Sequence, residues 1–335
     1  MTAASRVVTT ALLIGIANHA IGAATGLHAL RYVMGTWCDL VVLNSSPNAE
    51  AVEASFQEIA RLERVMSNWD AASEVSALNA RAGNGPQPVS TDLAAVVREA
   101  TDLCSLTAGA FDATVGSAVH AWGFDTESPR KPTSERARQA ASPVGCDRIR
   151  VQTEPPAIAL ERGTRIDLGG IGKGYAVDRA LTVLRAHGVT RAKLDFGSSS
   201  LGFVGQIDGG WPVVVADPRN RDRPLVSFRV SEGSVSTSGQ REHSFIRNGQ
   251  RYGHIFDPRT GLPVQSRLLL VTVIAPDAGL ADGLSTALFV MGSTEGARLV
   301  STLPDTAAIF VEERAGHDVT IVTTGRVDDL TRLDR

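Results

Sequence analysis

The stretch RIDLGGIGKGYAVDRALTVLRAHG, residues 165–188, shows how this chain passes from extended to helical structure. Its first four residues predict a short strand, and GGIGKG at residues 169–174 is a glycine-rich turn. A helix follows, because apolar residues return at helical spacing until Gly188 closes it. The apolar face consists of Ala176, Val177, Ala180, Leu181 and Leu184. A strand, a turn and a helix in this order expose backbone N–H groups that can bind a phosphate.

The glycine-rich turn matches neither of two common phosphate-binding motifs. A Walker A loop needs glycine where Asp167 stands and Ser or Thr where Gly174 stands. A Rossmann turn needs its last glycine where Tyr175 stands. Lys173 can still add its charge to a phosphate held by the turn. A tight structural turn with a surface lysine is the alternative.

Outward from this unit, helical and strand patterns mix without regular βαβ alternation. Amphipathic spacing predicts a helix over residues 52–66, a second from Ser90 or Thr91 to near Gly109, and a third over 280–291. Shorter helices follow the turn-rich segment 67–79 and lie within 129–143. The predicted strands are residues 32–43, 192–196, 211–216, 226–230, 268–274, 307–312 and 319–323. This mixture favours the α+β class.

Composition describes a folded globular protein. The chain has 335 residues, of which 43% are hydrophobic and 21% charged. A formal charge of −3 gives no general attraction to nucleic acid or to anionic membranes. We therefore expect no nucleic-acid partner.

The N-terminus has the pattern of a secretory signal. Arg6 precedes the apolar run VVTTALLIGIANHAIGAATG, and small residues follow near 22–24. A membrane anchor of marginal length is the alternative. We expect residues 1–27 to be a signal peptide or N-terminal anchor, residues 28–335 to be the functional domain, and the protein to be exported. The three cysteines, Cys38, Cys104 and Cys146, fit neither a disulfide scaffold nor a zinc site.

Two segments near the C-terminus carry side chains suited to phosphate chemistry. HIFDPRTG, residues 254–261, places His254 before a tight turn. ADGLSTALFVMG, residues 281–292, places Asp282 and Thr286 one helical turn apart on the same face. A carboxylate and a hydroxyl with open positions suit magnesium, and an imidazole suits proton removal at neutral pH. Purely structural roles are the alternative, and we interpret His120, His243 and His317 as structural.

The segment AFDATVGSAVHAWGF, residues 110–124, reads as an aromatic loop. A flavin or adenine ring could stack on its aromatic side chains while Asp112 bonds to the ligand. For this segment taken alone, we favour the alternative of a buried loop in which the aromatic side chains fill the core and Asp112 makes a local turn bond.

Taken in order, these segments resemble the ApbE-type FAD:protein FMN transferases. The matching segments are MGT (34–36), MSNWDAASEVSALN (66–79), GAFDATVG (109–116), AWGF (121–124), IDLGGIGKGYAVD (166–178), STSG (236–239), HIFDPRTG and ADGLSTALFVMG. The resemblance implies an exported magnesium enzyme that moves FMN from FAD onto a threonine of a partner flavoprotein and releases AMP. It also implies an α+β, T-fold-like architecture with mixed, largely antiparallel sheets and packed helices.

Residue roles follow from this resemblance. It implies that the FAD site is lined by Met34, Ser67, Ala110, Phe111, Asp112, Asp167, Lys173, His254 and Ile255. It implies that magnesium is held by the Gly170 carbonyl, Asp282 and Thr286. It also implies that His254 is the base, or at least the group nearest the incoming threonine hydroxyl. The implied partners are FAD and the acceptor flavoprotein, with membrane association through the N-terminus or the acceptor left open.

One segment departs from the family pattern. Where the family has Gly-Gly-Asp after a strand, this chain reads DFGSSSLGFVG, residues 195–205, with serines at 198–200. Asp195 or these serines would have to replace any contact that the acid makes.

Two other functions remain open from sequence. With water as the acceptor, the same site would be an FAD pyrophosphatase that yields FMN and AMP. Without catalysis, it would be a protein that binds or stores FAD. His254 and the Asp282–Thr286 pair argue against storage, because binding FAD requires no base.

Overall fold

The computed structural model describes residues 26–43, 48–240, 243–314 and 318–332. The expected signal peptide or anchor at residues 1–27 therefore lies almost entirely outside the described residues. Among the helices that the structure describes, none is both long and apolar enough to cross a membrane.

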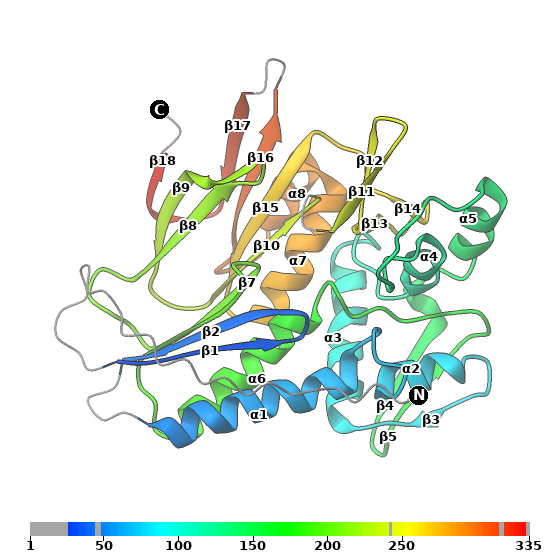
Figure 1. Cartoon of the computed structure of the whole chain (residues 1–335), viewed down its shortest axis with the longest axis horizontal. Helices are drawn as coiled ribbons and strands as arrows, with labels where there is room; N and C mark the ends of the chain where they lie inside the picture. The colour runs from blue at the N-terminus through cyan, green and yellow to red at the C-terminus, as the bar shows by residue number, and fades with distance from the viewer. Residues whose placement is uncertain (1–25, 44–47, 241–242, 315–317, 333–335) are drawn as a thin grey trace.

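An antiparallel sheet of eight strands forms the centre of the fold (Figure 1). Every neighbouring pair in it runs antiparallel. In sheet order the strands are β1 (Leu27–Val33), β2 (Thr36–Val42), β6 (Ala192–Phe196), β7 (Ser200–Val204), β10 (Ser234–Gly239), β15 (Leu268–Ala275), β16 (Ala307–Glu313) and β17 (Val319–Thr324). The helices and this sheet confirm the α+β class and the largely antiparallel pairing.

At β16 both faces of the sheet are covered. Ala308 and Phe310 belong to the hydrophobic cluster on the helical side. Ile309 and Val311 belong to the cluster shared with a second, three-stranded sheet. That sheet contains β8 (Trp211–Asp217), β9 (Asn220–Val230) and β18 (Asp328–Arg332). Because alternate residues are buried on opposite faces, β16 is a continuous apolar run.

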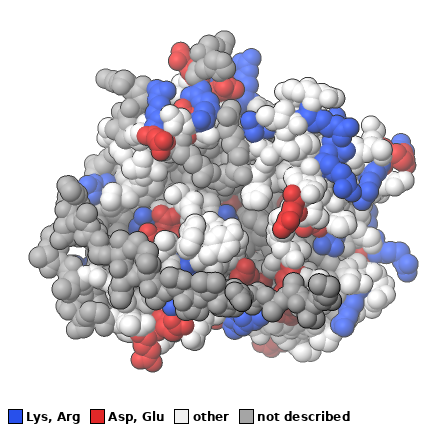
Figure 2. Space-filling model, in the orientation of Figure 1, with Lys and Arg blue, Asp and Glu red and all other residues white. Residues whose placement is uncertain are grey.

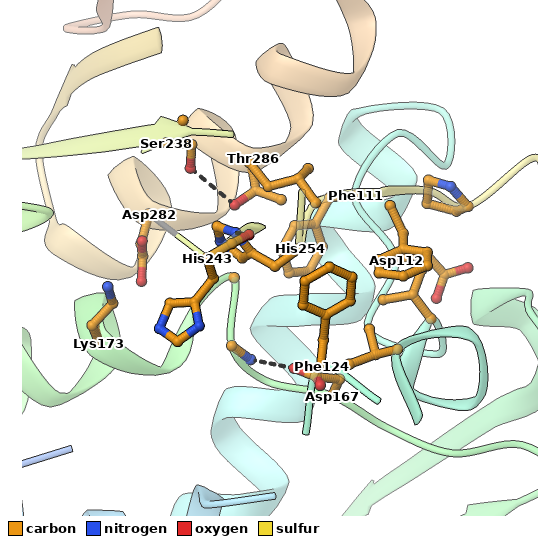
Figure 3. A pocket seen from close by; sticks show the side chains of 18 of the residues that line it. Phe111, Asp112, Phe124, Asp167, Lys173, Ser238, His243, His254, Asp282 and Thr286 are labelled. Atoms are coloured by element: carbon orange, nitrogen blue, oxygen red, sulfur yellow. Dashed lines mark hydrogen bonds between the residues drawn. The ribbon is translucent and has the colours of Figure 1, made fainter. Parts of the chain in front are cut away.

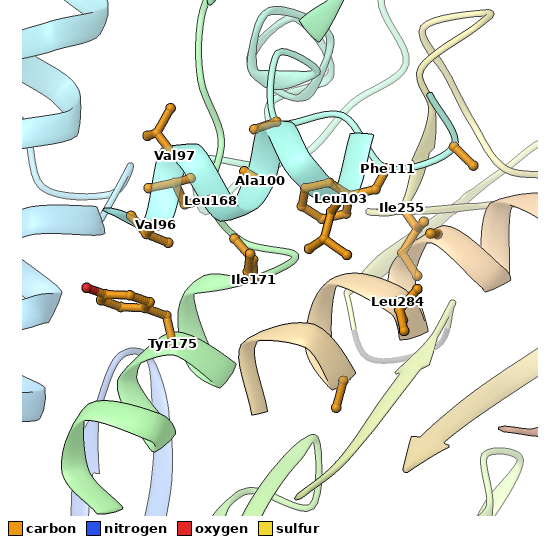
Figure 4. Packing of buried hydrophobic residues seen from close by; sticks show 14 of the residues in the cluster. Val96, Val97, Ala100, Leu103, Phe111, Leu168, Ile171, Tyr175, Ile255 and Leu284 are labelled. Carbon is orange, nitrogen blue, oxygen red and sulfur yellow. The ribbon is translucent and has the colours of Figure 1, made fainter. Parts of the chain in front are cut away.

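Helices cover the other face. They are α1 (Ala49–Met66), α6 (Gly172–Ala186), α7 (Ala278–Met291) and α8 (Ser293–Val300). Outside this layer, α2 (Glu74–Ala80) packs against α1, and α3 (Thr91–Leu106) packs against α1 and α7. Figure 4 shows α3 packing against the starts of α6 and α7 through Val96, Leu103, Ile171 and Leu284. Beside α3 lies a small sheet of β3 (Gln87–Pro88), β5 (Pro156–Leu160) and β4 (Ile149–Thr153). This packing fixes the N-terminal end of α6.

An aromatic cluster joins α4 (Gly116–Trp122) to the two short hairpins of the fold. It joins Trp122, Phe124, Phe245, Tyr252 and Phe256, whose ring centroids lie 5.2–6.4 Å apart in contacting pairs. Besides α4, the elements that carry or adjoin it are α5 (Ser134–Ala141), β11 (Ser244–Arg247), β12 (Gln250–Gly253), β13 (Phe256–Asp257) and β14 (Leu262–Pro263). Two short hairpins, β11–β12 and β13–β14, are thereby attached to the rest of the fold.

Three sequence expectations need correction. Residues 32–43 do not form one strand, because Met34 and Gly35, both at positive φ, turn the chain into the β1–β2 hairpin. Residues 165–168 form only one isolated bridge. There the Asn79 side chain bonds the N–H and C=O of Ile166, so a neighbouring strand is not needed. Residues 110–124 are not all loop, because they contain α4.

The structure contains a disulfide, which the spacing of the cysteines did not predict. It joins Cys104 in the last turn of α3 to Cys146 at the start of a short 3₁₀ helix (Cys146–Arg148). Cys38 is buried and free. The two bonded residues are 42 positions apart in sequence, so only the tertiary fold brings them together.

Candidate active site

A cavity of about 210 Å³ opens where α6, α7, the loop before α4 and the segment from β10 to β13 meet. Its side chains are shown in Figure 3. Trp69 also lines the cavity, with 58% of its surface exposed. Pockets for organic ligands usually enclose roughly 300–1,000 Å³. A dinucleotide would therefore extend past this cavity and over its rim.

One side of the cavity, here called the metal wall, consists of Lys173, Ser238, Asp282 and Thr286. Asp282 is only 5% exposed. Its Oδ2 accepts the N–H of Gly174 at 2.9 Å, and its Oδ1 accepts the Ser236 hydroxyl at 3.0 Å. Burial raises the pKa of Asp282, and the charge of Lys173 opposes that rise. A buried carboxylate in this setting favours a nearby cation.

The donor set on this wall fits magnesium. A Cβ added to Gly170 would lie 3.2 Å from Thr286 Oγ1, so the Gly170 backbone passes directly against that hydroxyl. Thr286 Oγ1 also lies 3.3 Å from Ser238 Oγ. The Gly170 carbonyl, the Asp282 carboxylate and the Thr286 hydroxyl all offer oxygen, the ligand that magnesium prefers. The residues present can therefore hold this ion.

The unusual serine run contacts the metal wall directly. Lys173 Nζ donates to Ser199 Oγ at 2.7 Å, and Ser199 Oγ donates to the Phe196 carbonyl at 2.8 Å. Ser200 Oγ lies 3.3 Å from the Ser236 hydroxyl that supports Asp282. The serines thus position Lys173 with a neutral acceptor.

A second part of the lining, here called the histidine wall, contains His243, His254, Ile255 and Phe256. The His254 backbone N–H donates to the His243 carbonyl at 3.0 Å. His254 Nδ1 lies 3.2 Å from the same oxygen, which can only accept. The proton is therefore on Nδ1, and Nε2 keeps its lone pair.

Electrostatics keep His254 neutral. Burial lowers its pKa to about 4, with further contributions from the charges of His243 and Lys173. At neutral pH the imidazole is in the form that can accept a proton. Figure 3 shows both imidazoles on the side of the cavity that holds Lys173 and Asp282.

A residue that we interpreted as structural from sequence, His243, lies at this site. It lines the cavity, and its ring centroid lies 5.8 Å from that of His254 at 71°. The signal that could have found it is Asn-Gly at residues 248–249, a strong hairpin turn. A hairpin centred there pairs Ser244 with Gly253 and so brings His243 beside His254.

The third part of the lining is aromatic. Phe111 and Phe124 lie at the far side of the cavity from Lys173 (Figure 3). Asp112, nearby, is 7% exposed and accepts the Thr114 N–H at 2.8 Å and its hydroxyl at 2.7 Å. Burial raises the pKa of Asp112. Thr114 Oγ1 accepts the N–H of Gly145, so the disulfide at Cys146 lies behind this wall.

Most of the predicted site residues meet in this cavity. They are Ala110, Phe111, Asp112, Asp167, Gly170, Lys173, His254, Ile255, Asp282 and Thr286. Asp167 accepts the Gly169 N–H at 2.7 Å, and burial raises its pKa. Met34 and Ser67 do not line the cavity: Met34 packs in the β1–β2 turn, and Ser67 caps α1. Their predicted contacts with FAD stay predictions. Trp69, Thr237, Ser238, Gly239 and His243 line it without having been assigned a role from sequence.

Known proteins share this sequence and fold. Residues 34–310 match the ApbE family. The FAD:protein FMN transferase of Treponema pallidum is 31% identical over 318 residues, which cover 89% of this chain and 88% of that protein. The one from Haemophilus influenzae is 31% identical over 261 residues, 75% of each chain.

Solved structures agree. The ApbE protein of Thermotoga maritima superposes with a TM-score of 0.79 at 31% identity, covering 88% of this chain and 96% of that one. The flavin transferase ApbE of Vibrio cholerae gives a TM-score of 0.80 at 25% identity, with coverage of 90% and 98%. Fold and relatives together define a flavin transferase. The chain belongs to the ApbE family.

Proposed function

We propose that this protein uses magnesium to transfer FMN from FAD to a threonine of a partner flavoprotein and releases AMP. The observation that carries this proposal is a neutral His254 that shares one cavity with Lys173 and the Asp282–Thr286 pair. A base, a fixed cation and a set of oxygen ligands are what an alcohol needs to attack a pyrophosphate.

The chemistry follows from these residues. The threonine hydroxyl oxygen forms a bond to the FMN-side phosphorus, and the bond between that phosphorus and the bridging oxygen of AMP breaks. The hydroxyl proton moves to Nε2 of His254, and AMP leaves with the bridging oxygen. Lys173, positioned by Ser199, neutralises negative charge on the pyrophosphate.

The metal site has a supporting role. The Gly170 carbonyl, Asp282 and Thr286 would hold magnesium, which supplies charge neutralisation when bound. Gly174 and Ser236 orient the Asp282 carboxylate for this task. The aromatic side chains of Phe111 and Phe124 offer stacking surfaces for a flavin or an adenine and exclude water.

The same proposal includes export from the cytoplasm. The apolar run at residues 7–26 supports it, and so does the Cys104–Cys146 disulfide, because structural disulfides persist in oxidising compartments. Alkaline phosphatase fused after residue 27 tests it: activity outside the cytoplasm is expected. Phosphatase activity that appears only when residues 1–27 are replaced by a known signal peptide would contradict export.

One assay tests the transfer. The purified chain is incubated with FAD, magnesium and an exported flavoprotein, and both AMP and the acceptor's mass are measured. Transfer gives AMP and a mass gain equal to one FMN residue on a threonine. AMP without acceptor modification, across a panel of exported flavoproteins, indicates an FAD pyrophosphatase. FAD binding without AMP indicates storage.

A further inference from the structure

The β11–β12 hairpin begins and ends at the candidate active site. Its strands pair Ser244 with Gly253, which leaves His243 and His254 side by side at its base. The hairpin is a two-stranded sheet of its own and extends away from the central sheet (Figure 1). A protein that brings a hydroxyl to His254 must approach close to this hairpin.

One face of the hairpin is packed and the other is open. Phe245 and Tyr252, a directly opposed pair, pack against Trp122. Ile246 and Arg251, the next pair, point to the opposite face because side chains alternate along a strand. Ile246 is 62% exposed. An exposed aliphatic residue beside an arginine is a composition suited to protein contacts.

Two basic residues of this hairpin, Arg247 and Arg251, and two of the neighbouring loop, Arg130 and Lys131, are here called the basic band. Arg247 Nη1 donates to the Lys131 carbonyl at 3.4 Å, and Lys131 Nζ donates to the Tyr252 hydroxyl at 2.9 Å. These contacts join the hairpin to the loop between α4 and α5. Figure 2 shows Lys and Arg gathered over this part of the molecule.

In the part of the chain that the structure describes, the charge of the band has no carboxylate partner. Within the described residues, none of its four side chains forms an ion pair with a carboxylate. The chain as a whole carries a net charge of −3, so this local excess of positive charge runs against its composition. A surface of this kind attracts acidic partners over a distance of about 8–10 Å in physiological salt.

The band is separate from the cavity lining. None of its residues lines the cavity, and in the proposed function the side chain that neutralises the pyrophosphate is Lys173. We propose that the β11–β12 hairpin and the basic band form the docking surface for the acceptor flavoprotein, which binds through an acidic segment beside its target threonine. This inference rests on the proposed transfer function and names the surface chemistry of its protein substrate.

The test reverses two charges that make few contacts of their own. In the full chain, Arg130→Glu with Arg247→Glu is compared with wild type, using the flavoprotein that wild type modifies in the transfer assay. The KM for the acceptor is expected to rise about tenfold or more, because like charges oppose encounter. The KM for FAD should stay within about twofold, because the band lies outside the cavity. The pair Arg130→Gln with Arg247→Gln should give an intermediate KM.

A matched control makes the same change in net charge elsewhere. Arg150→Glu with Arg162→Glu alters exposed arginines at β4 and after β5, and should leave the acceptor KM unchanged. For wild type, sodium chloride should raise the acceptor KM more steeply than for the reversed pair.

Each other result would overturn the inference. An unchanged acceptor KM in the reversed pair rejects the docking surface but leaves the transfer function intact. A parallel rise in the KM for FAD assigns the band to the small substrate. Loss of binding to phosphatidylserine vesicles, with an unchanged acceptor KM, assigns it to a membrane. If wild type modifies no exported flavoprotein, the proposed function itself fails, and this inference fails with it.

Discussion

The two walls of the cavity are built in different ways. The metal wall stands on α6, α7 and β10, which belong to the main hydrophobic core and the central sheet. The histidine wall belongs to two short hairpins that are attached through a small aromatic cluster and, at Ile255, through the main core. The side chains proposed to bind phosphate and metal thus come from two core helices and the central sheet, and the proposed base comes from the hairpins.

This difference separates two tasks. Gly174 on α6 donates to Asp282 on α7, while Asp178 on α6 accepts the first N–H groups of α7 at 2.8 and 2.9 Å. The two helices therefore hold the metal wall as one rigid unit. In the histidine wall, the His254 ring is oriented by the His243 carbonyl oxygen, 3.2 Å from Nδ1. Changes in the first wall should affect binding and stability, and changes in the second should affect turnover.

The sharpest test of the histidine wall is His254→Ala. We expect kcat to fall about 10²- to 10⁴-fold, the usual contribution of general base catalysis, while the dissociation constant for FAD changes little. Steady-state transfer kinetics and flavin fluorescence titration measure the two quantities. His187→Ala, at an exposed histidine that caps α6, is the control and should behave as wild type. Equal turnover in His254→Ala would remove this residue from the mechanism.

For the metal wall the matching change is Asp282→Asn. The amide has no charge to attract a divalent cation, so the magnesium concentration for half-maximal activity should rise roughly tenfold or more. A magnesium titration of FMN transfer checks this. Asp305→Asn, at an exposed residue in the turn before β16, serves as control. An unaltered titration curve would exclude Asp282 as a ligand.

The rigid pairing of α6 and α7 can be broken at a single glycine. A Cβ at Gly174 would lie 2.1 Å from the Ala278 carbonyl oxygen, so Gly174→Ala should destabilise the fold by about 1–3 kcal/mol or more. At Gly172 the nearest atom is 3.7 Å away, so Gly172→Ala should be neutral or stabilise by about 0.5–1 kcal/mol. Urea denaturation compares them. Similar losses for both variants would contradict the close helix contact.

The smallest effect concerns pH. The pKa of His254 is about 4 in the folded chain and near 6.5 when unfolded, so the unfolded state binds more protons between these values. Stability from keeping this ring neutral is present above pH 6.5 and is lost as pH falls towards 4. Replacing the ring by His254→Gln should therefore reduce the acid-induced fall in melting temperature. Calorimetry at pH 7.5 and pH 5 measures it, and identical falls in both proteins would reject the lowered pKa.

Sequence predicted the well-patterned elements and most of the cavity lining. Strands such as 192–196 and helices such as 52–66 follow from apolar periodicity, which the structure confirms. Sequence did not predict that residues 165–168 lack a partner strand among the described residues, because there the Asn79 side chain takes over the backbone hydrogen bonding of Ile166. It also missed His243, whose role depends on a hairpin partner eleven residues away. From sequence, the serines at 198–200 indicated the loss of an acidic contact, whereas in the structure Ser199 accepts a hydrogen bond from Lys173.

Because of the Cys104–Cys146 disulfide, the stability of a purified sample depends on the redox conditions under which the protein was produced. Closing a loop across 42 residues removes chain entropy worth about 4 kcal/mol from the unfolded state. That is a large share of the roughly 5–15 kcal/mol that keeps a typical domain folded. Reduced protein from the cytoplasm and oxidised protein from an exported fraction therefore differ in stability, although their sequence is the same. Thiol titration before any kinetic or calorimetric comparison tells them apart.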